Sequence, residues 1–516
     1  MERLHHLLHA LDPQQVKVLK NYLTGFSTRD GNTKLWELAA LVLSDKNKIP
    51  GEKARSKKAI YKTKNAERKN RLKNRLYIKV LDSLLIDINT DRDIYEDEAH
   101  PIQVRLRKKM ILYDLFKFTP LKLTVGMELL NDIISAAKEY EFHSILLEAM
   151  YIYKGNYGFR KGTEFFNKVS KEITYYEKCN QYAQRARDLY LELSLYSTFE
   201  TKADKNKLEE FLQKSIAELR QYSLETNVKS VGYFLKTFEL THLQFNKKNI
   251  EAREIAISMI EFLKKNRAVG RKARFGIAYG TIAEIEMRIG DYDSAMKYLY
   301  KGREYFSGSA MNLAISKTIE TDILFLKGDY QKAKEMATSL ANDHSKVTGD
   351  FRRDIMLYYK ASCHFMLGEY REAARLFNLK FQLTRDKLGW EVNIRFMRIL
   401  AMLELNRPDE ATMMVENVYQ HIRHYKQIKY LNERDQMLLK LFRELAMEGF
   451  GFGTPNHKIY HLLLQLQEAE KPHSWEVLSP ELIPIHNWVI KKYGRLVPPG
   501  EYRLKKKKVF KTAARM

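Results

Sequence analysis

The chain lacks the features that mark secreted, membrane-spanning or disulfide-rich proteins. Cys179 and Cys363 are the only cysteines among its 516 residues, which excludes a disulfide framework and is typical of a reducing compartment. No apolar run approaches the ~18 residues that a membrane-spanning helix needs. The first residues lack the apolar core and cleavage site of a signal peptide. We therefore expect a cytoplasmic protein without a membrane span, in which both cysteines are buried small apolar side chains.

Proline is missing from a long central stretch. None of the 11 prolines lies between residues 121 and 407, and this stretch is rich in Leu, Ala, Lys and Glu. A proline inside a helix removes a backbone donor and clashes with the preceding turn, so its absence favours continuous helices. No segment shows a convincing strand pattern. With 45% hydrophobic residues the chain can bury its apolar faces, and the predicted fold class is all-α.

Sequence signatures of catalysis are missing too. The glycines from Gly270 to Gly280 have no preceding strand and no Gly-Lys-Ser/Thr ending, which excludes a phosphate-binding loop. His5 and His9 are one helical turn apart, but only Glu2 is close enough to act as a further metal ligand. No serine elbow or Cys–His pairing at a recognisable spacing is present. We therefore expect no catalytic, cofactor or metal site and no enzymatic activity.

Positive charge is concentrated in two segments. Residues 51–79 hold 12 Lys or Arg and two acidic residues, and residues 503–516 hold seven Lys or Arg and no acid. These segments supply most of the formal net charge of +25. Such a distribution indicates an acidic partner for the two segments more than a generally cationic surface. We expect the second segment to be a disordered tail.

A helix predicted over residues 66–88 carries part of the first basic segment. Arg68, Arg71, Arg75 and Lys79 recur at helical spacing and form one stripe, opposite an apolar face. The stripe could contact a phosphate backbone, an acidic protein or an anionic membrane surface, or it could be a solvated face of a packed helix. No zinc-finger, recognition-helix or aromatic RNA-binding motif favours nucleic acid, so the alternatives stay open.

A short phrase repeats in the second half of the chain. Gly290-Asp-Tyr-Asp-Ser-Ala295 returns as Gly328-Asp-Tyr-Gln-Lys-Ala333 and as Gly368-Glu-Tyr-Arg-Glu-Ala373, and a degraded copy ends at Ala411. The copies follow one another at steps of 38, 40 and 38 residues. A fixed period in this range predicts stacked supersecondary units, here helical hairpins. Glycine ends the first helix in a left-handed conformation, tyrosine packs at the turn, and alanine allows the two helices to approach closely.

These units resemble tetratricopeptide repeats, in which a glycine and an aromatic residue stand at the turn and a small alanine opens the second helix. The matching residues are Gly290, Tyr292, Ala295, Gly328, Tyr330, Ala333, Gly368, Tyr370, Ala373 and Ala411. The spacing exceeds that family's 34 residues. The resemblance implies a right-handed α-solenoid of helical hairpins with a concave groove that binds peptides or protein segments, and it implies no reaction. By the same resemblance, the groove-facing positions on first helices include Glu284, Arg288, Tyr358, Ser362 and Asn393.

The predicted organisation has five parts. They are an N-terminal helical module with a basic segment (1–100), divergent hairpins (101–270), recognisable repeats (271–425), C-terminal capping helices (426–500) and a basic tail (501–516). The function that this organisation favours is a non-catalytic scaffold or adaptor that binds a protein or peptide segment in its groove. Two alternatives remain: a regulator that binds nucleic acid through its basic N-terminal region with the repeats as sensor, and an enzyme with an unrecognised site.

Overall fold

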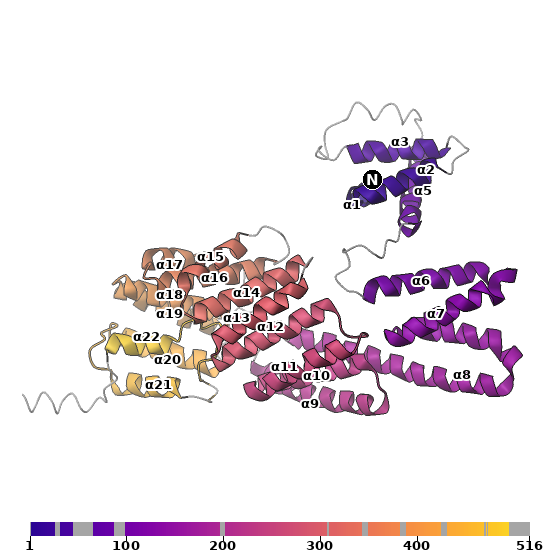
Figure 1. The fold of residues 1–516 in the computed structure, drawn as a ribbon. Coiled ribbons are helices and arrows are strands. Elements are labelled where there is room, and N and C mark those ends of the chain that lie inside the picture. The colour runs from indigo at the N-terminus through magenta and orange to yellow at the C-terminus, as the bar shows by residue number, and fades with distance from the viewer. Residues whose placement is uncertain are drawn as a thin grey trace, which may run out of the picture. The chain divides into compact units, whose positions relative to one another are not determined.

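The computed structural model divides the chain into two compact units, residues 1–92 and 93–516 (Figure 1). Within the described residues every regular element is a helix and no strand occurs, which confirms the all-α fold class. No described helix is both long and apolar enough to cross a membrane. The structure describes residues 2–25, 31–44, 66–86, 99–196, 202–306, 309–342, 349–381, 389–424, 431–468, 471 and 473–494.

The N-terminal unit packs its helices around a leucine-rich core. Its described helices are α1 (Glu2–Ala10), α2 (Pro13–Thr24), α3 (Gly31–Ser44) and α5 (Ala66–Ile86). Asp12 caps α2, because its carboxylate accepts a hydrogen bond from the Gln15 backbone N–H at 2.8 Å and the Gln15 side chain accepts one from the Asp12 N–H. Each helix contributes a fully buried leucine to the core: Leu8, Leu19, Leu35 and Leu76.

The second unit is a succession of helices, each packed on its neighbours in the chain. Its elements are α6 (Ala99–Phe116), η1 (Pro120–Leu123), α7 (Val125–Glu139), α8 (His143–Tyr196), α9 (Lys202–Glu225), α10 (Lys229–Phe245), α11 (Asn249–Lys265), α12 (Lys272–Ile289), α13 (Tyr292–Arg303), η2 (Glu304–Phe306), α14 (Ala310–Leu326), α15 (Tyr330–Ala341), α16 (Gly349–Met366), α17 (Tyr370–Phe377), α18 (Trp390–Glu404), α19 (Pro408–His424), α20 (Glu433–Met447), α21 (His457–Gln467) and α22 (Ile485–Tyr493). Gly162 divides the long α8 into two arms, since its φ of 81° and ψ of −177° belong to a region that only glycine readily adopts.

One type of turn joins the two helices of most hairpins. A residue with positive φ ends the first helix, and the N–H of the next residue donates to the carbonyl five positions earlier at 2.8–3.0 Å. This is the Schellman arrangement, which pairs the last free carbonyls of a helix. It occurs at Glu141, Lys247, Gly290, Gly328, Gly368, Asn406 and Gly449. At all but the last of these, the second helix begins two residues later. The repeat therefore extends beyond the copies that the sequence phrase marks.

The residue five positions after each turn packs against the first helix. At the six regular turns this residue is fully buried; the set is Leu146, Ala252, Ala295, Ala333, Ala373 and Ala411. Five of the six are alanine, which allows close approach of the helices. The buried clusters follow one another along the chain, from α6–α8 through α8–α12 to α14–α22. This is the nearest-neighbour packing of a repeat array.

Candidate functional site

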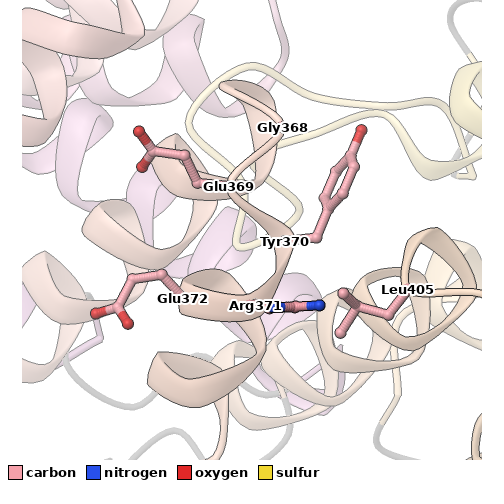
Figure 2. Close-up of a pocket in the computed structure, with 6 residues that line it drawn as sticks. All are labelled: Gly368, Glu369, Tyr370, Arg371, Glu372 and Leu405. Atoms are coloured by element: carbon pink, nitrogen blue, oxygen red, sulfur yellow. The ribbon is translucent and has the colours of Figure 1, made fainter.

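The turns themselves hold no converging polar groups. The hollow at the third sequence copy is lined by Gly368, Glu369, Tyr370, Arg371, Glu372 and Leu405 (Figure 2). Figure 2 shows both glutamates pointing away from Tyr370. Glu369 pairs with Lys334 at 3.1 Å and also with His364, while Glu372 pairs with Arg375 at 2.5 Å. Tyr370 packs edge-on against Phe365. The signature residues thus build the hairpin and leave this hollow without an unpaired acid.

A non-helical segment, residues 473–484, covers the faces of several first helices; we call it the strap. Val477 and Leu478 pack against a buried cluster from α12, α13 and α14. The Tyr358 hydroxyl of α16 donates to the Pro480 carbonyl at 3.0 Å. Lys247, at the turn after α10, pairs with Glu476 at 2.7 Å. The residues of the strap are buried or half-buried. An irregular segment of this chain, which turns at residues 476–479, is therefore held by successive hairpins of the same chain.

A buried ion pair fixes the C-terminal half of the strap. Arg434 of α20 and Glu481 are both about 5% exposed or less, and the guanidinium donates to both carboxylate oxygens. Arg434 also donates to the His473 carbonyl at 2.9 Å and contacts His486 Nδ1 at 2.8 Å. Burial and the adjacent Arg434 lower the pKa of His486 to about 4, so its neutral ring can accept this hydrogen bond. Bidentate, fully paired ions of this kind set a specific geometry.

Two carboxylates lie beneath the strap. Asp322 of α14 shares a small cavity with Trp475, Leu478 and Leu482 of the strap and with Tyr359 of α16. Burial raises the pKa of Asp322 to about 7; the Tyr359 hydrogen bond opposes this rise, and the neighbouring Glu284 carboxylate adds to it. Burial also raises the pKa of Glu284, against the attraction of Arg288. The strap therefore places apolar side chains over acids that it does not neutralise.

The sequence-predicted groove residues lie on first helices, but not on an open surface. Tyr358 and Ser362 of α16 are 1% and 0% exposed, and the strap lies against Tyr358. Asn393 of α18 is 2% exposed and donates to the Gly389 carbonyl at 2.8 Å and to Asp435 at 3.3 Å, so it links α18 to α20. Glu284 and Arg288 of α12 are half-buried. The prediction did not include the chain's own cover, which buries this face.

The predicted basic stripe is only partly presented to solvent. Arg71 and Arg75 of α5 have exposed side chains. Lys79 instead donates to the Tyr22 hydroxyl at 2.9 Å and pairs with Asp82 at 3.3 Å, and these hydrogen bonds, Tyr22 first, raise its pKa. Lys79 thus ties α5 to α2. The Arg68 side chain, most of residues 51–79 and the predicted tail 503–516 lie outside the described residues.

Sequence reasoning missed Asp322, Arg434, Glu481 and the strap. Asp322 stands six residues before Gly328, just as Glu284 stands six before Gly290, so the offset used for the groove positions could have found it. The spaced prolines Pro472, Pro480 and Pro484 indicated an irregular segment, although not its location. Nothing in the sequence pairs Arg434 with Glu481, which are 47 residues apart. Within the described residues no group of three or more His, Cys, Asp or Glu could hold a metal.

Comparisons with known proteins found distant structural matches. No protein-family model and no curated protein matches the chain. Among solved structures, a signal transduction ATPase with numerous domains and a tetratricopeptide repeat sensor, from Pyrococcus horikoshii, matches at 14% identity and a TM-score of 0.37, over 86% of this chain and 66% of that one. The present chain thus spans just under two thirds of that protein. The tetratricopeptide repeat domain of P58(IPK) matches at 12% identity and a TM-score of 0.20, over 75% of this chain and 99% of that one.

The turns and buried alanines carry the architectural conclusion. Seven Schellman turns with positive φ recur along the second unit, and the position five residues later is buried at each of the six regular ones. The second unit is, in its described residues, an all-α array of helical hairpins, and residues 473–484 of the same chain lie against several of its first helices.

Proposed function

We propose that the chain is a non-catalytic scaffold that binds an extended protein or peptide segment across its first helices. The observation that supports this is the strap itself. Apolar packing against α12 and α14, a hydrogen bond from Tyr358 and an ion pair from Lys247 together hold a non-helical segment on this face. A face with the contacts to hold one non-helical segment in cis has the chemistry to hold another in trans.

The test uses the full chain with a loosened strap. Val477→Ser with Leu478→Ser removes the apolar contacts to α12 and α14 and keeps the Arg434–Glu481 pair. We expect a fluorescein-labelled peptide of residues 473–484 to bind this variant saturably, at least about tenfold more tightly than it binds the wild-type chain, whose own strap competes at high effective concentration.

The matched control is Leu224→Ser, which changes a leucine that is 90% exposed on α9. It should bind the peptide no better than the wild-type chain, as read by fluorescence anisotropy. Circular dichroism checks that each variant keeps its helices. If a folded, loosened chain shows no saturable binding, the face holds the strap only as a part of the fold, and the proposed function fails.

A further inference from the structure

The strap is unevenly attached to the face that it covers. Its C-terminal half is fixed by the buried Arg434–Glu481 pair, and the Glu481 carboxylate also accepts from the Ile485 backbone N–H at 2.8 Å. Its N-terminal end is fixed as well, since the His473 carbonyl accepts from Arg434 at 2.9 Å and the buried Ser474 hydroxyl donates to the Glu468 carbonyl at 2.9 Å. Between these ends, Glu476 pairs with Lys247, and these two side chains are 44% and 50% exposed, so the pair contributes little. Residues 475–478 are otherwise held by partly buried apolar contacts and by a hydrogen bond from Trp475 Nε1 to the Glu481 carbonyl at 2.8 Å. They are the least firmly held part of the strap.

Trp475 and Leu478, in this part of the strap, line the cavity at Asp322 and bring no counter-charge to it. The groups that act on Asp322 are its burial, the Tyr359 hydroxyl and the Glu284 carboxylate. Arg288 acts on Glu284. The strap residues that line the cavity with Asp322 carry no positive charge; they are Trp475, Leu478, Ser479, Leu482 and Glu481, whose carboxylate is paired with Arg434. The Asp322 carboxylate must therefore either keep a proton or remain charged in apolar surroundings.

We propose that the first-helix face takes, in trans, an extended segment that carries a lysine or arginine among apolar residues, and that this segment displaces strap residues 475–478. This rests on the proposed function, since it requires the face to accept a segment in trans. An ammonium or guanidinium in the cavity pairs with Asp322, to which the strap brings no cation, and is also attracted by the neighbouring Glu284 carboxylate. The strap then excludes acidic or purely apolar segments, because these gain nothing over the segment already in place.

The experiment compares three labelled peptides on the loosened chain, Val477→Ser with Leu478→Ser. The first has the sequence of residues 473–484; the second carries Leu478→Lys; and the third carries Leu478→Met, an uncharged control of similar length. All three are acetylated and amidated so that no terminal charge intervenes. We expect the lysine peptide to bind about tenfold more tightly than the other two, as a single added charge pair in a partly buried site allows.

A fourth arm locates the effect. In the loosened chain with Asp322→Asn, the advantage of the lysine peptide should fall to about twofold or less, because one of the two acids is gone. The peptide with the unaltered strap sequence should bind this variant at least as tightly as before, and its affinity should no longer weaken as the pH rises from about 5 to 8.

The outcomes separate the two proposals. If no peptide binds the folded, loosened chain, the proposed function fails. The inference that the face binds a segment with a lysine or arginine then fails with it. Should the unaltered peptide bind while the lysine peptide binds equally or more weakly, the function stands and the inference is overturned. The inference is also overturned if the lysine peptide keeps its full affinity advantage in the Asp322→Asn variant, because the lysine would then pair with a group other than Asp322.

Discussion

The replacement Asp322→Asn should stabilise the protein, and more so as the pH rises. Burial raises the pKa of Asp322 from its ordinary 3.8 to about 7. A carboxyl group whose pKa is raised on folding binds more protons in the folded state than in the unfolded state between these two values. The free energy of unfolding therefore falls as the pH rises from about 4 to about 7, and it is constant above that window. Asparagine is neutral throughout, can still accept from Tyr359, and does not share this loss.

The size of the effect follows from the pKa shift. Each pKa unit corresponds to about 1.4 kcal/mol, so the burial penalty on Asp322 has an upper bound of about 4 kcal/mol above pH 7 and of about 1.6 kcal/mol near pH 5. Any difference in packing or hydrogen bonding between asparagine and aspartate is the same at both pH values. The quantity to compare is thus the gain near pH 8 minus the gain near pH 5, which we expect to be positive and up to about 3 kcal/mol.

Urea unfolding at the two pH values, followed by Trp fluorescence and by circular dichroism, measures this quantity. Asp329→Asn is the control on the same hairpin, since a hydrogen bond from Lys332 lowers the pKa of Asp329 and its contribution has the opposite sign. A gain from Asp322→Asn that is equal at both pH values, or larger near pH 5, would refute the argument that Asp322 is buried without a cation.

Other substitutions test the turns, the packing and the ion pair. Gly290→Ala should lower the free energy of unfolding by about 1–2 kcal/mol, because the added Cβ meets no atom within 4 Å and only the φ of 94° opposes the substitution. Asn406→Gly, at a φ of 59°, should raise the free energy of unfolding by up to about 1 kcal/mol. Urea unfolding midpoints measure both changes. Ala373→Leu at a fully buried contact should cost about 1–3 kcal/mol by overpacking, seen as a lower melting temperature. Glu481→Gln should cost about 3–5 kcal/mol by leaving Arg434 buried without its partner charge, and adding Arg434→Met should recover part of this loss in the same urea assay. An unchanged midpoint for any of the single variants would contradict the contact that it tests.

The repeated phrase located the turns where glycine marks them, whereas over residues 101–270 the sequence predicted only divergent hairpins and named no turn residue. Gly290, Gly328 and Gly368 adopt the left-handed backbone that the resemblance required. Glu141 and Lys247 adopt the same conformation with side chains that rarely do so, and no sequence rule marks them. In each case the side chain makes another contact: Glu141 accepts from the backbone N–H of Ser230 at 3.0 Å, and Lys247 pairs with Glu476. Tertiary contacts outweighed local preference at these turns.

The sequence predicted which helices carry the candidate groove residues, but not that these residues are covered. Offsets from the turn glycine placed Glu284, Tyr358 and Ser362 on first helices, because helical periodicity fixes which residues share a face. Whether that face is open depends on contacts between residues far apart in the chain, such as Tyr358 with Pro480, 122 residues later. Periodicity carries no information on such pairs. The burial of the predicted groove residues therefore had to come from the structure.

The ends of the strap and residues 475–478 between them have different physical roles, and this difference connects the fold to the proposed function. The Arg434–Glu481 pair is buried and multiply hydrogen-bonded, so removing either partner leaves a charge that the interior cannot solvate. Residues 475–478 lie over Asp322 at an unfavourable electrostatic contact. If the strap served only to complete the core, the fold would be more stable with an apolar residue in place of Asp322, or with a cationic residue in the strap next to it. A cover that is fixed firmly at its ends and poorly matched between them is what a face needs if it is to stay closed to most segments and open to one that supplies the missing positive charge.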